Sequence, residues 1–89
     1  MTPRSIRLRI YQPNFTGVEL GKLNLFFSYE TLVAICDTEH GWVVSKNVWS
    51  ATTGRHMNKH IPIAKEDWWD HDEWETKVAE ILREHGLFT

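Results

Sequence analysis

The stretch that most constrains the fold is residues 23–37, the most apolar region of the chain, which contains neither proline nor glycine. Its aromatic and β-branched side chains favour extended strands over one long helix. We therefore predict two strands, at about residues 23–28 and 31–37, joined by a tight turn or a bulge at Tyr29 and Glu30.

Residues 5–11 alternate between apolar and polar side chains, which is the pattern of a half-buried strand. The apolar face holds Ile6, Leu8 and Ile10, and the other face holds Arg7, Arg9 and Tyr11. A proline, an asparagine and two glycines within residues 13–21 then break regular structure, so we expect a loop or a loose hairpin there.

A hairpin loop is predicted at residues 37–41, where Gly41 supplies a positive φ. Residues 42–45 form the returning strand. The strands together indicate a small antiparallel meander of three to four strands.

The polar and aromatic segment at residues 47–60 predicts a short helix. Ser50 is a suitable N-cap for a helix that begins at Ala51 or Thr52. Trp49 and Met57 are expected to anchor this helix in the core. The donors that we expect it to present outward are Arg55, His56, Lys59 and His60.

A second helix is predicted over residues 70–85, with Asp70 as its N-cap and Glu73 returning the bond as in a capping box. Its apolar stripe consists of Trp74, Val78, Ile81 and Leu82. Gly86 ends the helix, and Leu87 and Phe88 are expected to fold back onto its last turn. The predicted fold class is α+β, with this C-terminal amphipathic helix packed on one face of the sheet.

The length of 89 residues suits one modest core, so residues 1–89 are expected to form a single domain. The contents of hydrophobic residues (42%) and charged residues (25%) are ordinary for a globular protein and argue against disorder. No apolar run approaches the roughly 20 residues of a membrane helix. The N-terminus lacks the apolar region of a secretory signal, and Cys36 is the single cysteine. These features predict a cytoplasmic protein.

The net charge of −2 conceals an asymmetry along the chain. Residues 1–64 contain seven Lys or Arg and four Asp or Glu, a balance of +3, whereas residues 65–89 contain three and eight, a balance of −5. Positive charge is therefore concentrated in the first part of the chain and negative charge in the last part.

Metal binding and catalysis both have limited support in the sequence. His56 and His60 have a helical zinc-ligand spacing, but no third ligand is near them in sequence, so no metal and no cofactor is predicted. No phosphate loop or nucleophile elbow is present. Cys36 lies in the most apolar segment, where a small core residue is expected. We therefore predict that the chain is not an enzyme.

Binding of a macromolecule is the better supported class of function. Trp68 and Trp69 are adjacent, so we expect at least one indole to be exposed in a protein interface. Nucleic acid is the alternative partner, because Arg7, Arg9 and Tyr11 share one strand face and Lys46, Arg55 and Lys59 surround Trp49. The predicted binding residues are Trp49, Thr52, Thr53, Arg55, His56, Asn58, Lys59, Trp68 and Trp69.

Two segments, residues 25–35 and 44–58, carry a resemblance to a known group of proteins. The second contains the pattern Trp-Ser-x-Thr-Thr-Gly-x-His-x-Asn. The pattern resembles one in small uncharacterised proteins of tailed bacteriophages, for which no activity is known. The resemblance implies a setting in the host cytoplasm during infection or in a prophage. Our functional hypothesis is a non-enzymatic phage-type accessory protein that binds another macromolecule, most readily a host or viral protein. Nucleic acid and a second copy of the chain are the other partners considered, and no membrane is expected.

Overall fold

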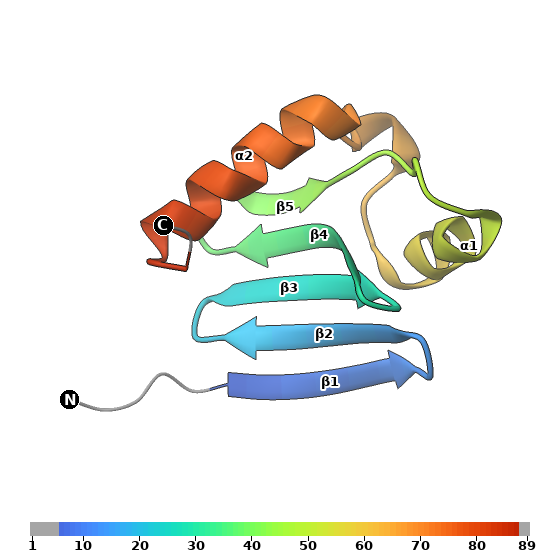
Figure 1. Ribbon diagram of the computed structural model, residues 1–89, viewed down its shortest axis with the longest axis horizontal. Helices are drawn as coiled ribbons and strands as arrows, with labels where there is room; N and C mark the ends of the chain where they lie inside the picture. Colours follow the sequence, from blue (N-terminus) through green and yellow to red (C-terminus); the bar gives the residue numbers. More distant parts are fainter. Residues whose placement is uncertain (1–5, 88–89) are drawn as a thin grey trace.

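The computed structural model describes residues 6–87, which form a five-stranded antiparallel sheet and two α-helices (Figure 1). The strands follow one another in the order β1-β2-β3-β4-β5, so the sheet is a simple meander. Their bounds are β1 Ile6–Gln12, β2 Phe15–Leu20, β3 Leu23–Ser28, β4 Thr31–Asp37 and β5 Gly41–Val44. The α+β class is confirmed, but the expected three to four strands are five.

The additional strand is β2, which occupies the segment that we expected to be a loop or a loose hairpin. Its Gly17 is not a turn residue, because it pairs with Arg9 of β1 and with Phe26 of β3. A Cβ at Gly17 would lie 3.0 Å from Cε2 of Tyr11, so the glycine makes room for the tyrosine ring. The glycine therefore serves close packing within a strand, a role that its sequence neighbours do not reveal.

The two strands predicted in the apolar stretch are confirmed as β3 and β4, and Tyr29 and Glu30 form the turn between them. Tyr29 adopts a φ of 56°, which is unusual for a residue with a side chain. Next to this turn, the pairing of β3 with β4 shifts register between Phe26 and Phe27. The register shift leaves Val33 without a partner in β3, and Val33 and Ala34 both enter the same core cluster.

The predicted hairpin between β4 and β5 is also confirmed. Gly41 has a φ of 68°. Asp37 shapes the loop, because its Oδ1 accepts hydrogen bonds from the backbone N–H groups of Glu39 at 3.1 Å and His40 at 2.6 Å.

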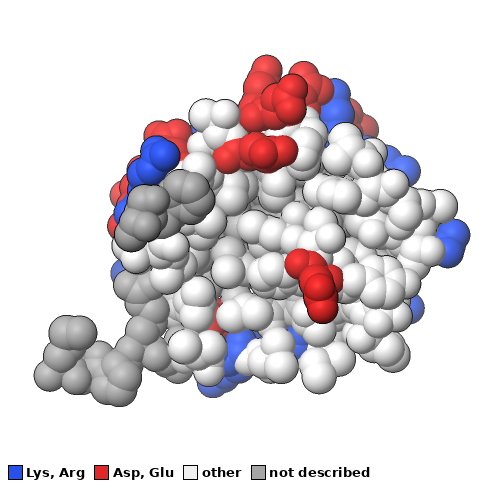
Figure 2. Space-filling view, in the orientation of Figure 1, with Lys and Arg blue, Asp and Glu red and all other residues white. Residues whose placement is uncertain are grey.

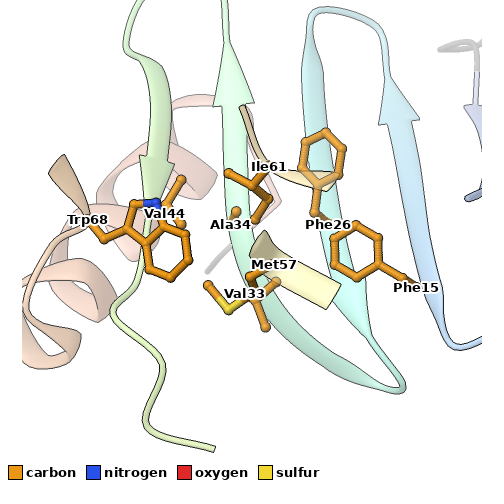
Figure 3. Packing of buried hydrophobic residues seen from close by; sticks show 8 residues of the cluster. All are labelled: Phe15, Phe26, Val33, Ala34, Val44, Met57, Ile61 and Trp68. Carbon is orange, nitrogen blue, oxygen red and sulfur yellow. The ribbon is translucent and has the colours of Figure 1, made fainter. Parts of the chain in front are cut away.

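One face of the sheet, which we call the back face, is covered by α1 (Ala51–His60) and by the chain that follows it. The predicted N-cap is confirmed, since the Ser50 side chain accepts a hydrogen bond from the Thr53 N–H at 3.1 Å. Met57 is completely buried. The core on this face, shown in Figure 3, consists of Phe15, Phe26, Val33, Ala34, Val44, Met57, Ile61 and Trp68. The chain between the two helices contains a short 3₁₀ helix, η1 (Lys65–Asp67).

The opposite face, which we call the front face, carries α2 (His71–Glu84). The stripe residues Trp74, Val78 and Ile81 are buried as predicted. They pack against Leu23, Ile35 and Val43 of the sheet. The Trp74 indole N–H also donates to the Val43 carbonyl at 3.1 Å. The helix therefore closes a second core on the other side of the sheet.

The ends of α2 agree only partly with prediction. Asp70 is the N-cap residue but makes no capping bond, because its Oδ1 accepts from Lys46 Nζ at 2.7 Å instead. The predicted capping box is therefore wrong. At the other end Gly86 has a φ of 72°, and the Leu87 N–H donates to the Leu82 carbonyl at 2.9 Å, as expected for a helix stop. The expected contacts of Phe88, like the start of the first strand at Ser5, lie outside the described residues.

No buried side-chain nitrogen or oxygen within residues 6–87 is left without a hydrogen-bond partner. Of the helices in this part of the chain, none combines the length and the apolar composition needed to cross a bilayer.

Candidate functional site

A buried polar cluster beneath α1 accounts for part of the residue 49–58 motif. Ser28 Oγ of β3 lies 3.0 Å from Thr53 Oγ1 and 2.9 Å from His56 Nδ1. The Ser50 hydroxyl in turn donates to Thr53 Oγ1 at 3.2 Å. His56 is only 5% exposed, so the expectation that it points outward is wrong. These side chains attach α1 to the sheet.

The serine and histidine of this cluster resemble in type the pair used in nucleophilic catalysis, where an imidazole activates a hydroxyl. Ser28, however, is only 1% exposed. Its oxygen is held between Thr53 and His56 beneath the helix, where a substrate has no access. The geometry fits a structural hydrogen-bond network.

The glycine of the motif also has a structural reason. Asn47 precedes α1 and bridges its first turn, donating from Nδ2 to the Ser50 carbonyl at 2.9 Å and accepting the Trp49 N–H at Oδ1 at 3.0 Å. A Cβ on Gly54 would lie 2.7 Å from Asn47 Nδ2. Gly54 therefore leaves room for the asparagine that orders the start of the helix.

The nine predicted binding residues fall into three groups by exposure. Buried are Thr53, His56 and Trp68; half-buried are Thr52, Trp49 and Trp69; exposed are Arg55, Asn58 and Lys59. They do not form one continuous surface, because the first group serves the core and its hydrogen bonds.

The tryptophan pair is packed on both sides of the sheet. The Trp69 N–H donates to the Val44 carbonyl at 2.7 Å, and its carbonyl accepts from the Lys46 N–H at 2.8 Å, so this segment runs as a short extension beside β5. Neighbouring residues of an extended segment point to opposite faces. Trp68 accordingly enters the back core and Trp69 packs against the front core. Neither indole is left fully exposed, contrary to expectation.

The histidines of α1 have protein partners. In addition to the bond from His56 to Ser28, His60 Nε2 lies 2.7 Å from Gln12 Oε1. The His60 ring stacks on Phe15 with ring centres 5.0 Å apart. Burial lowers the pKa of His60, and the charges of Lys59 and His56 lower it further. His60 is therefore neutral at pH 7 and adds little to a basic surface.

A cluster of side chains of the types that bind metals lies where the β4–β5 loop meets the end of α2. Ligand atoms of Glu39, His40 and Glu84 come within 4.8 Å of one another. The hydrogen bond from His40 to Glu84 Oε2, 2.9 Å long, raises the pKa of the histidine, which favours the protonated imidazole. The contact between His40 and Glu84 therefore joins the β4–β5 loop to the end of α2.

Cys36 is half-buried in β4. Burial raises the pKa of its thiol, and the neighbouring charge of Asp37 raises it further. The thiol is therefore protonated at neutral pH, which agrees with a packing role.

A hollow of about 400 Å³ lies between α2 and the start of β4. Its apolar wall consists of Leu32, Trp49, Trp74, Val78, Ala79 and Leu82. Trp49 meets Trp74 edge to face, with ring centres 6.2 Å apart. Of the predicted binding residues, Trp49 is the one that lines this hollow. Glu75 and His71, whose side chains contact each other, lie at its polar side.

An uncovered apolar area adjoins this hollow on the front face. Pairing registers connect the strands residue by residue: Leu8 lies beside Val18, Val18 beside Leu25, and Leu25 beside Ile35, which α2 covers. The outer strands therefore present their apolar side chains on the same side as α2. We call this area the apolar shelf; it consists of Ile6, Leu8, Ile10, Val18, Leu20, Leu25 and Phe27.

The β1 part of the shelf is open to solvent. Ile6 is 71% exposed, Leu8 62% and Ile10 69%. The prediction of a half-buried strand is wrong for this row, because α2 packs over β3, β4 and β5 and no element described lies over β1. Figure 2 shows acidic side chains gathered over α2 and, below it, a broad area of the same face with few charged groups. Exposed apolar rows of this kind mark interaction surfaces.

The alternation of β1 was visible in the sequence, but not its exposure. An alternating strand looks the same whether its apolar face meets a helix of its own chain or a partner. One signal was available: a single amphipathic helix about 10 Å wide cannot cover a five-stranded sheet. That comparison requires the fifth strand, which the glycine in β2 concealed.

Within residues 6–87 the fold is thus a five-stranded antiparallel meander with a helix on each face and one apolar area that no described element covers. The chain belongs to a family of unknown function (DUF8033), which it matches over residues 5–72. The matched part includes the sheet and α1 and ends in the first turn of α2. No curated protein and no solved structure was found to match the chain.

Proposed function

We propose that this chain is a non-enzymatic accessory protein that acts by binding another protein through the apolar shelf and the hollow beside α2. The observation that carries the proposal is the exposure of Ile6, Leu8 and Ile10 in one row. A monomeric protein rarely leaves three large aliphatic side chains together in water, because each loses the free energy of burial.

The arrangement of polar groups supports binding without catalysis. The titratable groups with altered pKa values are Cys36, Asp37, His40, Lys46 and His60, and none of them lines the hollow. The strand positions of the shelf are apolar except for Thr16, which lies between Ile10 and Phe27 and carries no charge. A surface of this composition can exclude water from a contact, and the titratable side chains at its hollow, His71 and Glu75, are in contact with each other. The phage-type setting, with a host or viral protein as partner in the host cytoplasm, rests on the resemblance alone.

Affinity capture from bacterial lysate tests the proposal. Tagged wild-type chain, Leu8→Lys and Val48→Lys are compared with and without nuclease, and bound proteins are identified by mass spectrometry. Val48 is 55% exposed and lies outside the shelf, so its variant is matched in charge and in lost apolar area. We expect a discrete partner that survives nuclease and binds wild type and Val48→Lys but not Leu8→Lys. Equal recovery with all three would reject the shelf as the binding surface.

A second candidate function, nucleic-acid binding, is favoured by one contact on the back face. The ring of Tyr11 lies 5.6 Å from that of His60. This contact brings the strand that carries Arg7 and Arg9 close to the end of α1 that carries Lys59. Arg9 is partly neutralised, because its guanidinium lies 3.3 Å from Glu19. This second candidate uses a different face of the sheet from the first.

The two functions are separated by their variants. Charge reversal of Arg55 and Lys59 should abolish binding of a labelled single strand and should leave the protein partner bound. The Leu8→Lys change should do the opposite. Nucleic-acid binding that is unaffected by the charge reversal would remove α1 from this candidate site.

A further inference from the structure

The partner that the shelf accepts can be argued from its dimensions. Neighbouring strands lie about 4.8 Å apart, so the axes of β1 and β3 are separated by about 10 Å. That distance equals the width of one α-helix, about 10 Å. A helix centred over β2 would contact all three strands and would lie on the same face of the sheet as α2, which runs along β5 (Figure 1). The seven residues of β1 extend about 23 Å, which is the length of about 15 helical residues.

The hollow gives such a helix an anchoring point. Phe27 of the shelf pairs with Leu32, which lines the hollow, so the two apolar areas are continuous. The volume of about 400 Å³ has room for a large side chain projecting from the docked helix. Large side chains inserted into apolar pockets provide much of the binding energy in protein interfaces.

Charge selects the type of helix. The front-facing strand positions of the shelf carry no charge, so the charges at its inner border come from α2 and from the turn between β3 and β4. Glu75 lines the hollow, where one of its carboxylate oxygens contacts His71, and its side chain is 61% exposed, so the carboxylate is accessible to a further partner. Glu30, in the turn before Thr31 at the hollow's edge, is exposed as well. A helix with Lys or Arg on the flank that faces α2 would complement these carboxylates.

Two other occupants fit less well. A strand added at the edge of β1 would leave the shelf side chains uncovered, because they stand perpendicular to the sheet. A second copy packed shelf to shelf would bring no strand cation to Glu75, because Arg7 and Arg9 lie on the back face. Neither arrangement both covers the apolar side chains of the shelf and brings a cation to the carboxylates at its border.

We propose that the shelf and the hollow bind a basic amphipathic α-helix of a partner protein, which lies beside α2. This inference rests on the proposed function, since it names the partner of the same surface.

Three synthetic peptides of equal length test the proposal. The first has a Leu and Lys pattern with helical period, the second has the same Leu face with Glu in place of Lys, and the third alternates Leu and Lys as a strand. Each labelled peptide is titrated with the full chain by fluorescence anisotropy, and helix formation on binding is followed by circular dichroism. We expect the first peptide to bind at least tenfold more tightly than either of the others and to gain helicity.

Matched variants show whether binding uses the proposed surface. Leu8→Lys should weaken the binding of the first peptide at least tenfold, and Glu75→Gln should weaken it several-fold. The controls Val48→Lys and Glu80→Gln should bind it as wild type does, because Glu80 lies on the other flank of α2, beside Trp69 and Lys77. Loss of binding in the controls to the same degree would overturn the proposal.

The outcomes separate this inference from the proposed function. Tighter binding of the acidic helix or of the alternating peptide, when it is sensitive to Leu8→Lys, would overturn the basic helix and retain a protein-binding shelf. A dimer of the free chain that is broken by Leu8→Lys would assign the shelf to a second copy and would also overturn it. Absence of peptide binding together with unchanged partner capture by Leu8→Lys would overturn both proposals.

Discussion

At the scale of single residues, the conspicuous motif of the chain is explained mostly by folding. Ser50 caps α1, and Thr53 and His56 bond to Ser28 of β3. Gly54 leaves room for Asn47. A pattern with several polar residues can therefore be specific because buried hydrogen bonds demand it, without any ligand.

The stability of the Ser28 variant tests this explanation. Ser28→Ala removes the hydroxyl shared by Thr53 and His56, so His56 Nδ1 loses its buried partner. An unsatisfied buried polar group costs about 1–3 kcal/mol. We expect the free energy of unfolding, measured by urea titration with tryptophan fluorescence, to fall by that amount. Thr38→Ala, in an exposed loop, is the control and should change it by less than about 0.5 kcal/mol. A stable Ser28→Ala protein would leave the motif without a structural explanation.

At the scale of elements, the strands and helices near strong local signals were predictable. The Ser50 cap and the stop at Gly86 follow from residue types, and the turn at Tyr29 follows from the division of the apolar stretch into two strands. The second strand was missed because Gly17 imitates a loop residue, although its role is to accept the Tyr11 ring. The capping box failed because Lys46, distant in sequence, competes for Asp70. Long-range contacts of this kind cannot be read from local patterns.

The division of the front face into a covered part and an open part gives a second prediction. Leu23 and Leu8 lie on the same face, but Leu23 is buried under α2 whereas Leu8 is 62% exposed. Leu23→Ala should lower the free energy of unfolding by about 2–5 kcal/mol, the range for buried leucine. Leu8→Lys should change it by less than about 0.5 kcal/mol. Chemical denaturation of both variants checks this contrast, and a large loss for Leu8→Lys would show that its row is structural.

The junction of α2 with the β4–β5 loop gives a prediction for pH. The hydrogen bond to Glu84 raises the pKa of His40 above 6.5, so this contribution to stability is complete below that pH and is lost as pH rises through the folded value. The effect is on the order of a few tenths of a kcal/mol, because Glu84 is 44% exposed and screened. Thermal unfolding between pH 6 and 9 should show a decline that His40→Gln removes. An unchanged slope in this variant would assign the decline to other groups.

Asp37 acts in the opposite direction at the same junction. Burial favours its neutral form, but hydrogen bonds from the His40 N–H and the His85 side chain outweigh burial and lower the pKa below 3.8. Its stabilising contribution is therefore present above the unfolded pKa and is lost as pH falls through the folded value. We expect Asp37→Asn to unfold more easily than wild type at pH 7, and we expect this difference to shrink on acidification below pH 4. A difference that stays constant would indicate that packing alone is affected.

At the scale of the whole molecule, the two faces of the sheet differ in how much of each is covered by helices and loops. The back face is closed by α1 and residues 61–69, whereas the front face has one helix for five strands. The sequence-predicted site on α1 and the tryptophan pair contributes largely to the closed parts. The uncovered shelf was absent from the predicted site, because single alternating strands do not reveal what covers them.

Photocrosslinking from the shelf tests the central claim most directly. A photoreactive phenylalanine analogue is placed at position 8 of the full chain in bacterial cells, and at position 48 as the matched exposed control. The account predicts a discrete protein adduct from position 8 after irradiation and none of that mass from position 48. An adduct that forms equally from both positions, or from position 48 alone, would contradict the assignment of the shelf as the binding surface.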